Sequence, residues 1–183
     1  MHVREQHRPS STGRLVHRLF EGTRLQLWSN DPRHPPVDLV PERPDVWILH
    51  PQGEPFPPGV PPAGVHLVLL DGSWNEASTM AKALGPRARR VSLPMTGESR
   101  YWLRSQQDGG RFSTAEALMA ALDRFGCGTE SAELGAQFEL HVYANLRARG
   151  QKELAARFLA GSRAAARFPA LLAQLQERRP LEE

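Results

Sequence analysis

Asp71 is the residue of this sequence whose position is best suited to chemistry. It follows an apolar run at residues 65–70 and comes two residues before Ser73. Glu76 lies three residues after that serine. An apolar run without polar alternation is typical of a strand covered on both faces, and the serine–glutamate spacing is typical of a capping box. We therefore expect Asp71 between the carboxyl end of a buried strand and a helix N-terminus, where open α/β sheets bind ligands. The alternative is an Asp-Gly turn without a ligand.

The elements that position Asp71 alternate between strands and helices. Short apolar runs predict strands at residues 25–28, 46–49, 65–70 and 90–93, and the proline-rich segment 51–64 is expected to be a stiff loop. Helical spacing of apolar residues predicts helices at about 15–20, 74–84, 114–125, 133–147 and 168–175. Hydroxyl residues at 10–12 and a second capping box at 113–116 precede the first and third of these helices. This alternation predicts a single α/β domain over residues 1–183, a mostly parallel sheet flanked by helices, with 151–183 as a basic helical extension.

Composition narrows the class of protein. The chain has 183 residues, of which 40% are hydrophobic, and a net charge of +3, with a sequence pI near 9.6. A single cysteine, Cys127, excludes an internal disulfide and a cysteine-cluster zinc site within this chain, and it is better explained as a packing residue than as a nucleophile. No metal site is expected. No apolar run reaches the ~18 residues of a membrane span, so we expect a soluble, cytoplasmic protein.

Basic residues are concentrated in two regions. Residues 147–179 hold eight basic residues against two glutamates, and residues 87–104 hold five arginines against Glu98. Such segregation favours contact with phosphates, and Tyr101 and Trp102 between arginines could stack on an unstacked base. The alternative is that the arginines solvate helix faces and the aromatic rings are core. We favour RNA contact for 87–104, whereas both interpretations stay open for 147–179.

Four segments resemble the motifs of one known family. The run Asp71-Gly72-Ser73-Trp74 resembles the Asp-X-Thr-Trp signature of the DTW-domain family, and residues 7–15, 48–51 and 101–117 are similar to its other blocks, in the same order. The resemblance covers roughly residues 7–150. It departs at Ser11, where asparagine is usual, at Ser73, where threonine is usual, and in lacking the N-terminal cysteine cluster that many members carry.

The resemblance implies a fold and a cofactor. DTW-domain proteins are SPOUT-like, with a knotted C-terminal region, and look like tRNA-uridine aminocarboxypropyltransferases that use S-adenosylmethionine. Three loops would hold the cofactor, with apolar walls around adenine and the helix N-terminus at 73–76 facing the methionine carboxylate. The cofactor-binding residues implied are Thr12, Leu49, His50, Pro51, Leu70, Gly72, Ser73, Trp74, Leu93, Pro94, Ser113, Thr114 and Ala115.

The resemblance also implies a reaction, in which uridine N3 attacks the carbon beside the sulfonium. We expect Asp71 to take the N3 proton or to orient the uridine. The partner would be tRNA, with no membrane and no protein partner, and the residues expected to contact RNA are Arg8, Arg14, Arg100, Tyr101 and Arg104. The alternatives are a SPOUT-type RNA methyltransferase, a non-catalytic RNA-binding module, and a small-nucleotide-binding α/β protein.

Overall fold

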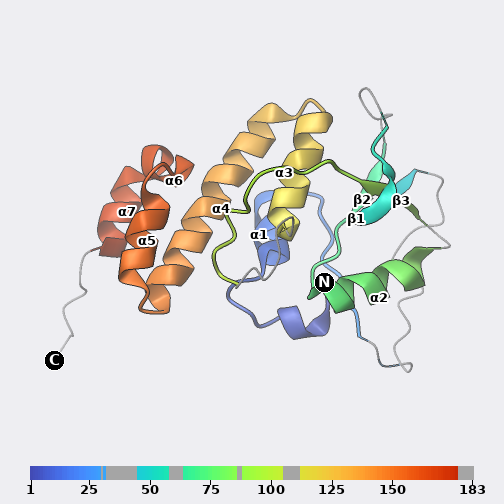
Figure 1. Ribbon diagram of the computed structural model, residues 1–183, viewed down its shortest axis with the longest axis horizontal. Helices are drawn as coiled ribbons and strands as arrows, with labels where there is room; N and C mark the ends of the chain where they lie inside the picture. Colours follow the sequence, from blue (N-terminus) through green and yellow to red (C-terminus); the bar gives the residue numbers. More distant parts are fainter. Residues whose placement is uncertain (30, 32–44, 58–63, 86–87, 105–111, 177–183) are drawn as a thin grey trace.

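The computed structural model describes residues 1–29, 31, 45–57, 64–85, 88–104 and 112–176. The strands and α2 form one half of the molecule, and the long helix α4 and the helices after it form the other (Figure 1). The chain is therefore an α/β protein with a small parallel sheet flanked by helices. In chain order its elements are η1 (Val3–Glu5), α1 (Thr12–Leu19), β1 (Val46–Pro55), β2 (His66–Val68), α2 (Trp74–Leu84), β3 (Arg89–Ser92), α3 (Thr114–Arg124), α4 (Gly128–Ala148), α5 (Lys152–Leu159), α6 (Arg163–Arg167) and α7 (Pro169–Gln176).

The sheet brings the ends of its strands together. Its three parallel strands have the order β2–β1–β3, with Val46 opposite His66 on one side of β1 and Trp47 opposite Arg89 on the other. Because the strands are parallel, their carboxyl ends lie at one edge of the sheet. The segments after β2 and β3 therefore begin at the same edge.

The carboxyl end of β1 is irregular. Leu49 and Glu54 both pair with Val91, so residues 50–53 bulge out of the strand. The bulge needs a glycine, because a Cβ on Gly53 would lie 2.7 Å from backbone atoms of β3. The expected end of the strand at His50 and Pro51 is therefore wrong, since pairing resumes after the bulge and continues to Pro55. Part of the expected loop at 51–64 is thus strand, and residues 58–63 lie outside the described part.

The side chains of β1 enter two apolar clusters, one on each face of the sheet. Val46 and Ile48 pack under α2, whereas Trp47 packs with Phe56 and Val91 on the opposite face. Both faces are covered, which explains why residues 46–49 show no polar alternation.

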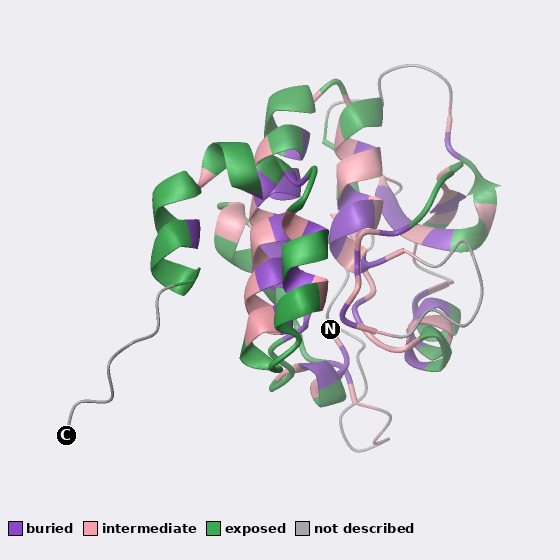
Figure 2. Cartoon of the chain, turned by 60° about the vertical axis from the view of Figure 1, so that its left-hand side comes forward, coloured by how far each residue is buried: buried purple, intermediate pink, exposed green. Residues whose placement is uncertain are grey.

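Helix α4 is the centre of the helical half. Leu134, Phe138 and Val142 are at most 1% exposed and belong to a cluster that also takes residues from α1, α3 and α5. Their spacing of four residues places them on one face, as the periodicity predicts. The outer faces of the C-terminal helices are exposed, with buried residues turned towards α4 (Figure 2).

Several element boundaries differ from the sequence predictions. The expected strand at 25–28 is wrong: it forms a single bridge, between His2 and Trp28, because its partner is a short stretch of backbone at residues 1–3. β2 covers three residues of the expected 65–70, and the expected burial of this strand on both faces is wrong, because β2 is the edge strand of the sheet and its residues are exposed or half-buried. α4 begins at Gly128 rather than at 133. The expected last helix at 168–175 is confirmed as α7, which starts at Pro169. Two short helices without predicted bounds, α5 and α6, precede it, separated at Gly161, whose φ of +76° ends α5.

Half-buried His141 makes the stability of the protein depend on pH. Burial lowers its pKa, and Arg18 and Arg149 lower it further, although a hydrogen bond to the Ser10 backbone acts in the opposite direction. Its Nε2 atom is buried without a hydrogen-bond partner among the described residues. Protonation therefore favours the unfolded chain, and we expect the free energy of unfolding to fall as the pH drops through the ordinary histidine value of 6.5.

Replacing His141 by glutamine tests this expectation. Urea unfolding of the wild type and of His141→Gln, each at about pH 7.5 and about pH 5.5, should show a smaller loss of stability for the variant. Some loss should remain, because burial and Arg90 also lower the pKa of His50. Equal losses in the two proteins would contradict the assignment to His141.

None of the helices in the described part of the chain combines the length and apolar character needed to cross a membrane.

Candidate active site

The carboxylate of Asp71 is held by two hydroxyl groups that come from distant parts of the chain. Ser11 Oγ donates to Asp71 Oδ2 and Thr114 Oγ1 donates to Asp71 Oδ1, each at 2.8 Å. The backbone carbonyl of Asp71 accepts the His2 N–H at 2.8 Å, and the residue as a whole is 7% exposed. Each carboxylate oxygen retains a further lone pair, so Asp71 is oriented by the fold and can still accept a hydrogen bond from a ligand.

Three helix N-termini meet at this carboxylate. Ser11 is the N-cap of α1, Thr114 is the first residue of α3, and Asp71 itself lies two residues before Ser73, the N-cap of α2. The N-terminal ends of three helices therefore lie near one carboxylate, and a helix N-terminus is a favourable position for a negative charge. This is the location predicted from the strand–helix junction.

Both predicted capping boxes are confirmed. At α2, Ser73 N–H donates to Glu76 and Glu76 N–H donates to Ser73. At α3, Ser113 and Glu116 exchange the same pair of hydrogen bonds. The Ser113 box also extends beyond its helix, because the Glu116 carboxylate accepts from Ser99 Oγ. It thereby fixes the segment after β3 against the start of α3.

Gly13 allows α1 to approach Asp71 closely. A Cβ on Gly13 would lie 2.7 Å from Asp71 Cγ and 2.8 Å from Oδ2, which is well inside van der Waals contact. The glycine is therefore required by the packing of the carboxylate rather than by a turn.

A cavity of about 1150 Å³ opens beside the carboxylate. Asp71 and Thr114 lie at its wall together with Gly13, and the open edge of β2 and residues 21–28 form much of the rest. Of the predicted cofactor-binding residues, Leu70 and Thr114 line this cavity. A carboxylate, a hydroxyl and apolar walls in one cavity are the usual composition of a small-molecule site.

The other predicted cofactor-binding residues surround the same end of the sheet. Leu49, His50 and Pro51 lie at the β1 bulge, and Leu93 and Pro94 follow β3 directly. Thr12 receives a long hydrogen bond from Ala115 N–H at 3.4 Å, which ties the starts of α1 and α3 together. Gly72 and Ser73 lead from Asp71 into α2, and Ser113 caps α3. The three loops are therefore brought together at the carboxyl ends of the strands.

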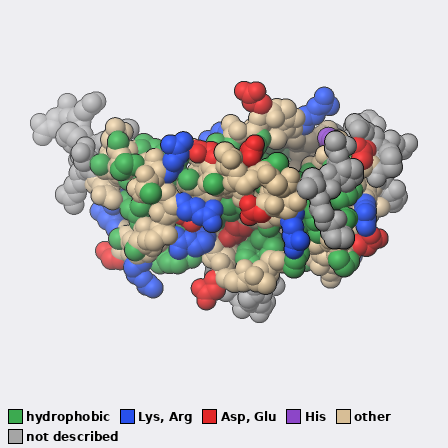
Figure 3. Space-filling view, turned by 90° about the horizontal axis from the view of Figure 1, so that it is seen from above, with side chains coloured by type: hydrophobic (Ala, Val, Ile, Leu, Met, Phe, Trp, Pro, Cys, Tyr) green, Lys and Arg blue, Asp and Glu red, His purple; other side chains and the backbone are tan. Residues whose placement is uncertain are grey.

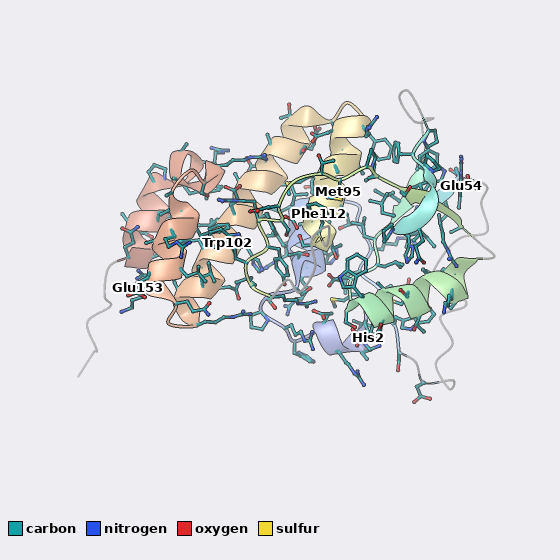
Figure 4. The ribbon with its side chains drawn as sticks, viewed as in Figure 1. His2, Glu54, Met95, Trp102, Phe112 and Glu153 are labelled. Carbon is teal, nitrogen blue, oxygen red and sulfur yellow. The ribbon has the colours of Figure 1, made fainter. Side chains whose placement is uncertain are left out.

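Trp74 is the first residue of α2 and is 40% exposed. It lies three residues from Asp71 along the chain but is not one of the residues that line the cavity. Figure 4 labels Met95 and Phe112 near the start of α3. It also labels His2 beside the first turn of α2, where Glu76 lies.

The N-terminus of α2 already holds a carboxylate. Although burial opposes it, hydrogen bonds from Ser73 and the charges of His2 and Arg4 hold the pKa of Glu76 below its usual range. Glu76 Oε1 lies 3.1 Å from His2 Nδ1. The expected open N–H groups for the methionine carboxylate at residues 73–76 are thus partly occupied, because Ser73 N–H bonds to Glu76 and a second anion there would be repelled.

Two of the predicted RNA contacts share one buried acid. Glu5 is 0% exposed, and its carboxylate accepts from Arg8 Nη1 at 2.7 Å and from Arg104 Nη2 at 2.6 Å. Both arginines remain partly exposed, at 49% and 36% of their side chains. Arg14 donates to the Gln6 carbonyl at 2.8 Å and its side chain is otherwise exposed.

The other two predicted RNA contacts bond to other parts of the protein, although the Arg100 side chain is 35% exposed. Tyr101 is 8% exposed, donates to the Ser10 carbonyl at 2.6 Å and stacks on Phe138, so its ring has no face for a base. Arg100 lies over the Phe158 ring at 4.3 Å and donates to the Phe158 carbonyl at 3.0 Å. Both side chains join the segment after β3 to the helical half of the molecule.

Sequence reasoning missed Ser11, Gly13 and Glu5 as parts of this site. Ser11 was expected only to offer a helix cap, and the partner of its hydroxyl lies 60 residues away. Glu5 carries no local motif, and the ion pair that explains it spans 99 residues to Arg104. No pattern within a single stretch of sequence indicates such contacts.

The described residues contain no cluster of three or more histidine, cysteine, aspartate or glutamate side chains that could hold a metal ion.

The model of the family described as DTW domain matches residues 1–146. No solved structure matches the chain.

Proposed function

The chain belongs to the DTW domain family, and from this premise we propose that it transfers the 3-amino-3-carboxypropyl group of S-adenosylmethionine to N3 of a uridine in tRNA. Membership in the family is consistent with a tRNA-modifying enzyme. The specific transfer, the cofactor and the tRNA partner are our proposal. We further infer that the sheet and the helices after it form a SPOUT-like fold with a C-terminal knot and that the protein acts in the cytoplasm.

One observation carries the proposal. Ser11, Asp71 and Thr114 come from three separate blocks of the sequence, and their side chains meet at a single carboxylate. Gly13 completes this arrangement by leaving no space between α1 and the carboxylate. A surface turn would need none of these contacts, whereas a side chain that must meet a substrate in one orientation needs such support.

The residues at the carboxyl edge of the sheet fit the chemistry of the cofactor. The exposed Trp74 ring and the exposed Pro51 provide apolar surface for an adenine ring. Asp71 and Glu76 place negative charge near a ligand whose reactive group is a cation. The starts of α2 and α3 each already hold a carboxylate, Glu76 and Glu116, in a capping box, so neither helix start is assigned to the methionine carboxylate. When bound, S-adenosylmethionine supplies an electrophilic carbon beside its sulfonium, from which methylthioadenosine leaves.

Asp71 then acts on the uridine. The N3 imide is a poor nucleophile while it carries its proton, so a carboxylate within hydrogen-bond reach increases its reactivity by accepting that proton. One N–C bond forms, one C–S bond breaks, and the proton passes through Asp71 to solvent. Ser11 and Thr114 are positioning residues, because their hydroxyls fix the plane of the carboxylate without touching the reacting atoms.

The direct test is a reaction with defined components. The purified protein is incubated with an unmodified tRNA transcript and S-adenosylmethionine, and the digested nucleosides are measured by mass spectrometry. We expect one uridine to gain the mass of an aminocarboxypropyl group, with release of methylthioadenosine. A gain of one methyl group would instead indicate a methyltransferase, and an unchanged uridine would contradict the proposal.

Trp74 provides a separate test of the cofactor site. We expect Trp74→Ala to weaken S-adenosylmethionine binding by about 5- to 150-fold, equivalent to about 1–3 kcal/mol, because a large aromatic surface is removed from the ligand. Isothermal titration calorimetry measures this change. The control is Trp102→Ala, because Trp102 packs against Phe158 in the helical half and its loss should not change cofactor affinity directly. Equal cofactor affinity in Trp74→Ala and the wild type would remove Trp74 from the site.

A further inference from the structure

Five arginines come from segments that contact one another and are joined to Asp71 through Ser11. They come from three segments: Arg8 and the α1 residues Arg14 and Arg18, then Arg104, and Arg149 just after α4. Among the described residues only Glu5 forms an ion pair with any of them, through Arg8 and Arg104. The group therefore has a large positive excess in a protein whose total net charge is +3.

Direct contacts make these segments one continuous surface. Arg149 Nη1 donates to the Leu103 carbonyl at 2.7 Å, next to Arg104. Tyr101, in the same segment, donates to the Ser10 carbonyl at the start of α1. Arg14 and Arg18 are one helical turn apart on the exposed face of α1, and the side chains of Arg14, Arg18 and Arg149 are all exposed.

This surface reaches the candidate active site. The N-cap of α1 is Ser11, whose hydroxyl bonds to Asp71. Burial, the largest effect, lowers the pKa of Arg104, but the nearby charges, that of Asp71 among them, outweigh it and raise the pKa. At the other end Arg18 and Arg149 both act on His141. The basic surface thus runs from Arg18 and Arg149 to within electrostatic reach of the carboxylate.

The C-terminal helices are less well suited to the same role. Basic and acidic side chains are intermixed over this half of the molecule in Figure 3. Arg167 pairs with Glu133 and Arg100 lies 3.6 Å from Glu139. Each of these two arginines is matched by an acid of its own, whereas Arg8 and Arg104 share the single charge of Glu5 and so keep a net positive charge that can attract a polyanion.

We propose that the surface formed by Arg8, Arg14, Arg18, Arg104 and Arg149 binds the phosphodiester backbone of the tRNA beside the modified uridine, an assignment that rests on the proposed function. Arginines at intervals along one surface suit successive phosphates, and the position of Asp71 at its end directs the adjoining base to the carboxylate. Arg100 and Tyr101 take no part, because their side chains are committed to the helical half.

The test measures tRNA binding against salt. We expect Arg18→Gln and Arg149→Gln each to weaken the binding of an unmodified tRNA transcript about 3- to 10-fold, and to reduce the slope of log Kd against log salt by about one. The matched control is Arg124→Gln. Arg124 is exposed and ends α3, whereas Asp71 lies at the start of α3.

Arg18 is the stricter of the two test positions. The Arg149→Gln variant also loses the hydrogen bond to Leu103, so its unfolding is measured in parallel, whereas Arg18 has no side-chain hydrogen bond to the described part of the chain. The proposal would be overturned if Arg18→Gln and Arg149→Gln bound tRNA as tightly as the wild type and the control Arg124→Gln. Effects that are independent of salt would also overturn it.

The outcome is separable from that of the proposed function. Binding is measured without cofactor, and nucleoside mass is measured on the wild type alone. Suppose that both arginine variants bind tRNA more weakly with a shallower salt slope, but the wild type leaves uridine unmodified. That result would support the RNA surface and reject the transfer reaction. If the wild type transfers the group but neither arginine variant changes tRNA binding, the transfer reaction is supported and the RNA surface is rejected.

Discussion

Replacing Asp71 by asparagine is expected to lower the rate of uridine modification by about 10²- to 10⁴-fold, the range typical for loss of a general base. Asparagine keeps the shape of the side chain and an oxygen for one of the two hydroxyl donors, Ser11 or Thr114. The other hydroxyl can rotate to accept from the new amide. The rate should therefore fall while the free energy of unfolding changes little, which single-turnover nucleoside analysis and urea unfolding measure together.

The pH dependence of this variant separates two roles for the carboxylate. If Asp71 accepts the N3 proton, raising the pH should restore much of the rate of Asp71→Asn, since N3 then loses its proton to solvent. If Asp71 only orients the uridine, the rate should stay low at every pH. A rate for Asp71→Asn within a few-fold of the wild type at neutral pH would refute both roles.

The second large effect is expected at Gly13. A methyl group added by Gly13→Ala would lie 2.7–2.9 Å from the Cβ, Cγ and Oδ2 atoms of Asp71. The carboxylate cannot rotate away without losing its bonds to Ser11 and Thr114. We therefore expect a loss of stability of about 1–3 kcal/mol, typical of an overpacked site, and a fall in modification rate of at least about tenfold from the displaced carboxylate.

Gly128→Ala is the matched control. Gly128 also lies in the first turn of a helix, α4, but a Cβ there has no neighbour within 4 Å. Because alanine has a higher helix propensity than glycine, this variant should be neutral or more stable by up to about 1 kcal/mol, with unchanged activity. Thermal unfolding and the nucleoside assay applied to both variants decide the matter. A tolerated Gly13→Ala would mean that Asp71 is free to move and that its support is not needed.

Local patterns were sufficient for much of the fold. Both capping boxes formed as predicted, because Ser–Glu at a spacing of three satisfies backbone groups within one turn and needs nothing from elsewhere. The buried face of α4 followed from its periodicity. Boundaries were less predictable where pairing with a distant segment decided them, as at the β1 bulge, whose register depends on Val91.

The role of the aromatic and basic segment at 100–104 could not be read from its composition. An arginine or a tyrosine is the same residue in the sequence whether its side chain faces RNA or the protein core. Tyr101 became a core residue because the Ser10 carbonyl and Phe138 lie beside it. Arg18 and Arg149 became neighbours of one surface because α1 packs on α4. Both outcomes are decided by contacts between helices far apart in the chain.

The sequence alone therefore determined that Asp71 lies between a strand and a helix start, because both signals are local, whereas the sheet order made that strand a half-exposed edge strand rather than the buried one expected. The tertiary structure alone decided that Ser11, Gly13 and Thr114 surround this carboxylate, since these residues are up to 103 positions apart along the chain and meet only when α1 and α3 start at the same place. Hydrogen-bond partners at that separation leave no periodic or compositional trace, so the support of the carboxylate is a property of the fold.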